Sequence, residues 1–262
     1  MRGWNRVHQL LVSRRFASSS KQSFVFSAAN FRDPTLPPNL AVKEVPLRLA
    51  TKESLQGFGL LVDDPADFTT EGKTFEIVKW PVSGWRQLDP ETGDEAGTTE
   101  GKFDVHWSGD YFFGKNLAIN TANNTYLDGL GAVPEVAVKE DPPAGSYNGG
   151  GSIHLWMSDY HPDGGQLFFP ENPIPFVVCL GQNTKGDDIT PDDMRAFWIP
   201  PGKGVYFHPG TWHNGVYVQR QYSPARFLTR QGRVHARVSA SWANEFKTLL
   251  KVPLSLTSSE TC

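Results

Sequence analysis

The stretch GSIHLWMSDYHPDGGQLFFP, residues 151–170, decides the fold more than any other part of the chain. It predicts two short β-strands, at 152–157 and 166–169, separated by a turn of proline, aspartate and glycine at 162–165. Four further strands are predicted at 174–180, 194–199, 204–207 and 216–219. Many short strands with turn signals at near-regular spacing indicate an antiparallel sandwich or barrel.

The sequence before this stretch favours the same all-β class. Residues 103–107 (FDVHW) alternate between apolar and polar side chains, as a half-buried strand does. Residues 51–58 (TKESLQGF) predict a short helix with Thr51 as its N-cap, followed by a strand at 60–62. A polar loop is expected at 89–101. We therefore expect an all-β fold with a few short helices.

Composition excludes several classes of partner. The formal net charge is −3 and the pI is about 6.2, so the basic excess typical of nucleic-acid binding is missing. No apolar stretch approaches the roughly 18–20 residues that a membrane span needs. The two cysteines, Cys179 and Cys262, form no disulfide framework and are interpreted as reduced thiols of an intracellular protein. A small molecule is the expected partner.

The first residues differ from the rest in composition. Residues 1–30 contain no Asp or Glu, carry several arginines and run into Ser18, Ser19 and Ser20. This composition predicts a cleavable organelle-targeting peptide at 1–22, mitochondrial rather than plastid, with an uncleaved disordered tail as the alternative. One folded domain is expected at 23–250, with a longer segment inserted at about 85–150. A flexible tail is expected at 251–262.

Four polar side chains are expected to converge inside the barrel. Asp159 and His161 are two positions apart on a strand, so their side chains point to the same side. Gln166 returns on the neighbouring strand after the glycine turn, and His213 follows the turn of a later hairpin. Nitrogen and oxygen donors in this arrangement predict a divalent-metal site for Ni, Zn, Fe or Mn.

These motifs resemble those of cupins, and among cupins those of ureidoglycolate lyases. The first cupin motif corresponds to Asp159-x-His161-x4-Gln166 and the second to Gly204-x4-Pro209-Gly210-x2-His213. The lyase-like stretches are HPDGGQLFFP (161–170), RAF (195–197), GKGVYFHPGTWH (202–213) and VPLRLATKESLQGFGLLVD (45–63). The resemblance implies a cupin double-stranded β-helix, a jelly-roll-like barrel, that acts as a homodimer.

The resemblance also implies a reaction, the cleavage of ureidoglycolate to glyoxylate and urea in purine and allantoin catabolism. His161, Gln166 and His213 are then expected to hold the metal, with Asp159 completing or orienting the set. Asp159, His161 and His208 are the candidate catalytic groups, and His208 is expected to shuttle the proton. Arg195, Lys203 and His154 are candidate substrate-binding residues, although His154 and His106 also fit half-buried sheet histidines.

Two other functions fit the same pattern. One is a different metal-dependent cupin reaction on a small hydroxy or oxo acid. The other is a non-catalytic binding or scaffold role, because cupin barrels host unrelated activities. Measurements of bound metal and of turnover together distinguish the lyase, the other cupin enzyme and the binding or scaffold protein.

Overall fold

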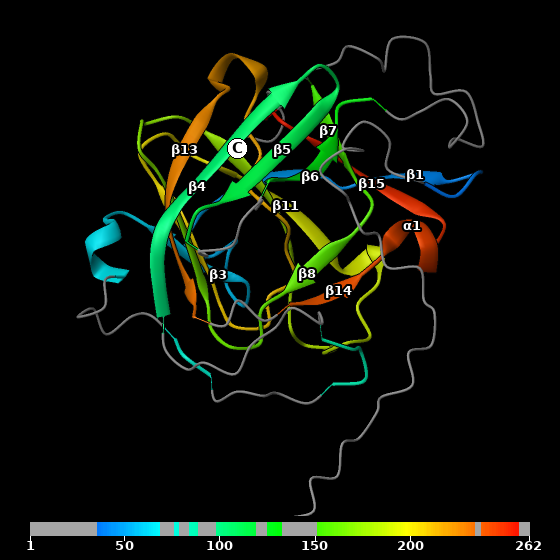
Figure 1. Cartoon of the computed structure of the whole chain (residues 1–262), viewed down its shortest axis with the longest axis horizontal. Helices are drawn as coiled ribbons and strands as arrows, with labels where there is room; N and C mark the ends of the chain where they lie inside the picture. The colour runs from blue at the N-terminus through cyan, green and yellow to red at the C-terminus, as the bar shows by residue number, and fades with distance from the viewer. Residues whose placement is uncertain are drawn as a thin grey trace, which may run out of the picture.

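The computed structural model describes residues 36–68, 76–78, 84–88, 98–118, 125–132, 151–233 and 237–256. The predicted targeting peptide lies outside these residues, as do residues 89–97, 119–124 and 133–150 of the predicted insertion. Strands are the main regular structure of the described residues and helical turns are very few, so the expected all-β, cupin-like fold is confirmed (Figure 1). Among the described residues no helix is long and apolar enough to cross a membrane.

One large sheet forms most of the barrel wall. Its ten strands follow the order β1-β15-β7-β6-β5-β4-β13-β9-β12-β3. Their bounds are β1 Ala41–Glu44, β3 Gly59–Val62, β4 Thr98–Ser108, β5 Tyr111–Asn116, β6 Thr125–Leu130, β7 Ser152–Leu155, β9 Gln166–Pro170, β12 Gly204–Phe207, β13 Ala225–Gly232 and β15 Thr248–Pro253. All neighbouring pairs are antiparallel except β1 and β15, which run parallel.

Two smaller sheets complete the fold. One has the order β10-β11-β2, with β2 Leu47–Leu49, β10 Phe176–Gly181 and β11 Met194–Ile199. The other pairs β8 Ser158–Tyr160 with β14 Val238–Ala240. Isolated bridges pair Val177 with Tyr217 and Asp159 with His213, and so join strands to the loop after β12. The helical turns are η1 Pro65–Phe68, η3 Pro191–Asp193, η4 Arg220–Tyr222 and α1 Trp242–Glu245.

The core consists of aromatic and aliphatic side chains from the facing sheets. Every residue of β10 is buried, because this continuous apolar strand is covered on both faces. Phe168 of β9 packs edge-on against Phe103 of β4, with ring centroids 5.1 Å apart, and Phe176 packs in the same way against Phe227. The Cys179 thiol lies in this core, where burial raises its pKa to about 12. A thiol kept protonated in this way is a packing group rather than a nucleophile.

Strand predictions based on local pattern are mostly confirmed. β11 and β12 have the predicted bounds, and β4 includes the predicted strand at 103–107. The predicted helix at 51–58 is wrong, because the segment forms consecutive turns. There, Thr51 and Ser54 exchange side-chain to backbone hydrogen bonds of 2.9 and 3.1 Å, and the Ser54 hydroxyl also donates to the carbonyl of Leu49 over 3.0 Å, which holds the start of the segment as a turn.

Other boundaries also differ from the prediction. The segment 216–219 is not a strand, since only Tyr217 forms a bridge there. β4 begins at Thr98, so residues 98–101 of the predicted polar loop are strand. β4, β5 and β6 lie in the middle of the large sheet, so the predicted insertion supplies part of the wall. β15 extends to Pro253, with Val252 fully buried, so the chain is folded beyond the predicted limit at 250.

Candidate functional site

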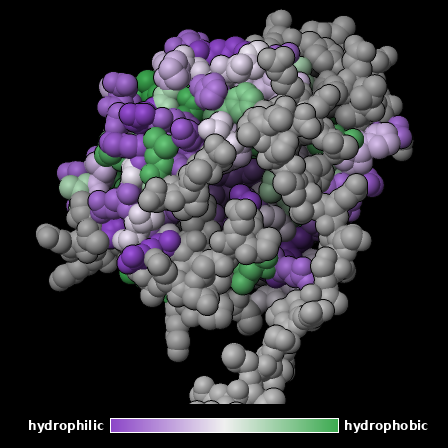
Figure 2. All heavy atoms as spheres, in the orientation of Figure 1, coloured by the Kyte–Doolittle hydropathy of each residue, from purple (hydrophilic) through white to green (hydrophobic). Residues whose placement is uncertain are grey.

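A small polar cavity of about 50 Å³ lies inside the barrel. Its walls come from β4, β6, β8, β9, the loop after β12 and the residue just before β14. The lining residues are Phe103, Tyr126, Asp128, Asp159, His161, Gln166, Phe168, His213, Asn214, Gly215 and Arg237. The space-filling view shows a hollow with hydrophilic residues near the centre of this face (Figure 2). The four residues predicted to converge all lie here.

The backbone ties the two motifs to each other. Asp159 and His213 pair as opposite residues and exchange two backbone hydrogen bonds of 2.7 Å. The amide of Gly210 donates to the carbonyl of His161 over 3.1 Å. Gly210 has φ +76°, a conformation that glycine adopts without strain, which explains a glycine in this turn. The motif spacing therefore brings His161 and His213 together, with ring centroids 4.8 Å apart.

The orientation of His213 is fixed by its own hydrogen bonds. Its Nδ1 lies 2.7 Å from the carbonyl oxygen of Thr211, which only accepts, so Nδ1 carries the proton. Burial lowers the pKa of His213 to about 3, with the charge on His161 as a second cause, so the ring is neutral near pH 7. Nε2 therefore presents a lone pair to the cavity.

That lone pair faces another acceptor. His213 Nε2 lies 3.0 Å from Oε1 of Gln166. Two acceptors at this distance require either a cation between them or a turned amide whose NH₂ group donates. A backbone-anchored imidazole whose second nitrogen points inward is a common arrangement for a metal ligand. The donor set of His161, Gln166 and His213 thus suits a divalent ion.

Asp159 is less directly part of that set. Its Oδ2 lies 3.7 Å from Nε of Arg237, which also lines the cavity. Within the described ranges, no group of three or more His, Cys, Asp or Glu side chains is placed to hold a metal ion. The structure therefore places two imidazoles and one amide together, with the Asp159 carboxylate held toward Arg237.

A second carboxylate lines the cavity, and the sequence analysis missed it. Asp128 on β6 is 5% exposed, and burial raises its pKa to about 7. The amide of Gly215 contacts its Oδ1 at a long 3.4 Å, and Asn214 also interacts with the carboxyl group. A side-chain carbon at Gly215 would collide with the other oxygen, so this approach requires glycine. Asp128 is thus partly protonated near neutral pH.

Two predicted residues lie away from the cavity, each hydrogen-bonded to a carboxylate. Nδ1 of His208 lies 2.6 Å from Oε2 of Glu76, and neither residue lines the cavity. Lys203 donates to Asp63 over 2.5 Å. The structure therefore brings neither the predicted proton shuttle nor this predicted substrate-binding residue to the interior histidines.

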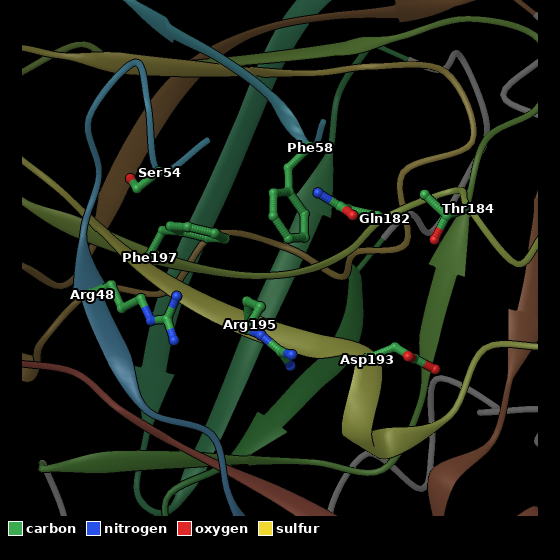
Figure 3. A pocket seen from close by; sticks show the side chains of 8 residues that line it. All are labelled: Arg48, Ser54, Phe58, Gln182, Thr184, Asp193, Arg195 and Phe197. Atoms are coloured by element: carbon green, nitrogen blue, oxygen red, sulfur yellow. The ribbon is translucent and has the colours of Figure 1, made fainter. Parts of the chain in front are cut away.

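The remaining two predicted substrate-binding residues also lie elsewhere. Arg195 lines a separate cavity of about 250 Å³, which is also lined by Arg48, Phe58 and Phe197 (Figure 3). His154 is buried on β7, where its Nδ1 lies 3.2 Å from the carbonyl of Leu130 and burial lowers its pKa to about 4. These features match the half-buried sheet histidine that was the alternative for His154.

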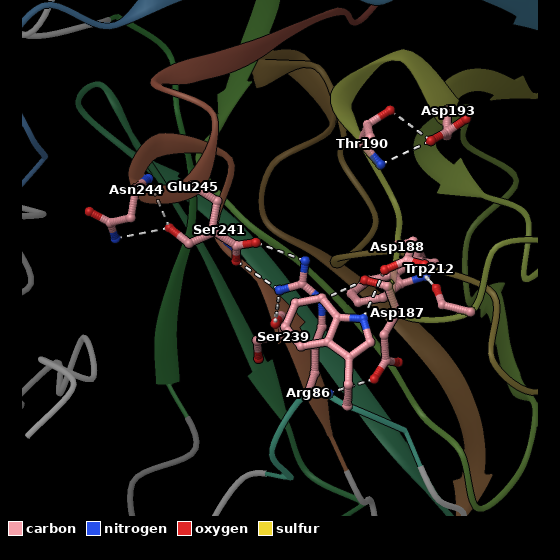
Figure 4. Close-up of polar contacts among 12 residues, drawn as sticks. Arg86, Asp187, Asp188, Thr190, Asp193, Trp212, Ser239, Ser241, Asn244 and Glu245 are labelled. Carbon is pink, nitrogen blue, oxygen red and sulfur yellow. Dashed lines mark hydrogen bonds and ion pairs between the residues drawn. The ribbon is translucent and has the colours of Figure 1, made fainter. Parts of the chain in front are cut away.

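A polar network surrounds the residues that directly precede His161 and His213 in the chain. Arg86 forms two hydrogen bonds of 2.8 Å with the Glu245 carboxylate and one of 2.8 Å with the carbonyl of Asp187 (Figure 4). The Asp187 carboxylate in turn accepts from the Tyr160 hydroxyl over 2.9 Å. Tyr160 packs on Trp212 with centroids 4.7 Å apart. The residues directly before His161 and His213 are thereby held against each other.

Fold and site together define a class, the cupin-like β-barrel protein with a polar centre inside the barrel. Within that class the family model described as ureidoglycolate lyase matches residues 122–243, which include every residue of the cavity except Phe103. Over this part the chain is thus similar to the ureidoglycolate lyases, in agreement with the resemblance seen in the sequence.

Individual relatives agree with the family match. A protein of Rhodobacter capsulatus named ureidoglycolate lyase is 40% identical over 59 residues, 22% of this chain and 35% of the relative. One of Brucella ovis with the same name is 31% identical over 81 residues, 31% of this chain and 46% of the relative. One of Mesorhizobium japonicum is 34% identical over 61 residues, 23% of this chain and 36% of the relative. The chain spans less than half the length of these relatives.

Proposed function

We propose that this protein is a carbon–nitrogen lyase of the amidine-lyase class that cleaves ureidoglycolate to glyoxylate and urea, as in purine and allantoin catabolism. The observation that carries the proposal is the interior cavity, where the lyase-like motif residues His161, Gln166 and His213 meet beside two carboxylates and a guanidinium. The family match covers the same part of the chain.

The reaction needs one proton removed and one delivered. Loss of the hydroxyl proton turns the C–O bond into a carbonyl, and the C–N bond breaks with its electron pair moving to nitrogen. Protonation of that nitrogen completes urea. A positioned acid and base carry out such steps efficiently. We assign removal of the hydroxyl proton, and its return to the departing nitrogen, to the carboxyl group of Asp159, which lines the cavity.

We further propose that His161, Gln166 and His213 hold a divalent ion of the Ni, Zn, Fe or Mn type. The support is the facing pair of acceptors, Nε2 of His213 and Oε1 of Gln166, 3.0 Å apart. When bound, such an ion supplies Lewis acidity that lowers the pKa of a hydroxyl group. The protein's own part is to keep His213 neutral through burial and to orient it through the Thr211 carbonyl.

The test uses the full chain, its metal content and the release of both products from ureidoglycolate. We expect glyoxylate and urea in equal amounts, and loss of both metal and turnover in His213→Ala. His106→Ala is the matched control, because His106 stacks on Phe113 on β5 and does not line the cavity. Full activity in His213→Ala would refute the proposed site.

The other two functions give different results in the same experiment. Bound metal without turnover would point to another small hydroxy or oxo acid. Neither metal nor turnover would point to the binding or scaffold role. Homodimer formation and mitochondrial import through residues 1–22 complete the proposal, and are measured by light scattering of the purified protein and by import of the full chain into isolated mitochondria.

A further inference from the structure

Two buried acceptors lie next to each other in the cavity wall. Oδ2 of Asp128 and Oδ1 of Asn214 are buried and have no hydrogen-bond partner among the described residues. Leaving a buried polar group without a partner costs roughly 1–3 kcal/mol, so such groups in native proteins usually serve a ligand or a water. Adjacent acceptors are complementary to a ligand with several N–H donors.

The backbone is shaped to keep these acceptors close together. Asn214 and Gly215 follow His213 directly in the chain, and the amide of Gly215 contacts Oδ1 of Asp128. Because Gly215 has no side chain, Oδ2 of Asp128 can lie against its backbone. The acceptor pair is therefore attached to the same loop that presents the imidazole of His213.

A cation lies in the same cavity. Arg237 is the one Lys or Arg among the described residues that line it, and its Nε is 3.7 Å from Oδ2 of Asp159. A guanidinium has five N–H donors in a fixed fork, so it can bind a ligand carboxylate while it contacts Asp159. The cavity thus offers acceptors for N–H groups and a cation for a carboxylate.

We propose that Asp128 and Asn214 bind the ureido end of the substrate through its N–H groups, and that Arg237 binds the carboxylate end. The cavity then selects a small acid that carries both groups, and holds it with the carbon between them beside His161 and His213. This inference rests on the proposed function and names the specificity residues of that site, none of which is among the predicted ones.

The experiment measures equilibrium binding of two unreactive probes by titration calorimetry. Hydantoate carries a ureido group and a carboxylate but no hydroxyl group, so it cannot undergo the cleavage. Glycolate carries the carboxylate and hydroxyl without the ureido group. We expect Asp128→Asn to weaken hydantoate binding at least tenfold and to leave glycolate binding within twofold. Arg237→Gln is expected to weaken both probes at least tenfold.

Matched controls come from a surface ion pair. Asp104 and Arg226 are linked by two hydrogen bonds of 2.5 and 2.7 Å outside the cavity, so Asp104→Asn and Arg226→Gln should leave both probes unaffected. If Asp128→Asn does not fold, Asn214→Ser provides the same test. Equal loss of both probes in Asp128→Asn, or no binding of hydantoate to the wild type, would overturn the proposal.

Failure of the proposed reaction gives a different result. If the probes bind with the expected selectivity but ureidoglycolate is not cleaved, the recognition residues stand and the lyase activity is refuted. If ureidoglycolate is cleaved while hydantoate binding is insensitive to Asp128→Asn, the activity stands and the specificity assignment fails.

Discussion

Replacing Asp128 by asparagine is expected to change how stability depends on pH. The ordinary pKa of this carboxyl is 3.8, and burial raises it to about 7 in the folded protein. Between about pH 4 and pH 7 the folded state therefore holds a proton that the unfolded state has released. The free energy of unfolding must then fall as pH rises through this range. At about 1.4 kcal/mol per pH unit, the contribution of Asp128 amounts to about 4 kcal/mol.

Two histidines act in the opposite direction. Burial lowers the pKa of His154 to about 4 and that of His213 to about 3, from 6.5. The unfolded state binds protons at these residues below pH 6.5, so they make the free energy of unfolding rise with pH up to that point. The wild-type curve alone therefore does not isolate Asp128, but the difference from Asp128→Asn does, since the variant keeps both histidines.

The assay is denaturant unfolding of both proteins at pH 4.5, 6 and 8 at constant ionic strength. Relative to the wild type, Asp128→Asn should gain about 3 kcal/mol between pH 4.5 and pH 8. Asp67→Asn is the control, because Asp67 is exposed and does not line the cavity. A difference between wild type and Asp128→Asn that does not change with pH would refute the assignment of a buried, largely protonated carboxyl.

Three further substitutions test the supports of the site. Leu250→Ala, at a fully buried position of β15, should lower the free energy of unfolding by about 2–5 kcal/mol in denaturant titration. Its control is Val42→Ala, at an exposed position on β1, which should change the free energy of unfolding by less than about 0.5 kcal/mol. Gly215→Ala should lower hydantoate affinity at least tenfold by pushing Asp128 aside, and unchanged affinity would contradict the close approach. Arg86→Ala should cost about 2–4 kcal/mol, because it removes the guanidinium that donates to the Asp187 carbonyl and to the Glu245 carboxylate, and a loss under about 0.5 kcal/mol would show that the network is not structural.

Local pattern predicted the strands that are bounded by clear turn signals. β11 and β12 were placed correctly because their apolar residues are bounded by proline and glycine turns. The central position of β4 was not predictable, since its pairing with β13 joins Phe103 to Phe227 across more than a hundred residues. The turn at 51–58 was misjudged because a Thr and a Ser that cap helices also stabilise turns.

The residues of the candidate site likewise include some that the sequence predicts and some that it does not. Asp159, His161 and Gln166 are close in sequence, and they reach one cavity with His213 even though β8 pairs with β14 and β9 with β12 and β13. Asp128 and Arg237 reach that cavity from β6 and from the residue before β14, and neither has a local motif. An aspartate within the otherwise apolar and aromatic stretch TYLDGL of β6 was the one available signal for Asp128. Arg195 and Lys203 were chosen for their charge, which does not determine the direction of a side chain.

The polar cavity also argues for a functional interior over a structural one. Phe103 and Phe168 line the same space, so this part of the barrel accommodates apolar side chains. Filling it with more of them would have removed the cost of burying Asp128 and of keeping His213 neutral, since apolar replacements of buried charges are often stabilising. Instead, two imidazoles, two carboxylates, two amides and a guanidinium line one small volume. That concentration of destabilising groups is expected where selection acts on ligand binding or catalysis. The variants His213→Ala and Asp128→Asn separate metal binding from substrate recognition, because the first removes an imidazole ligand and the second removes a ureido acceptor.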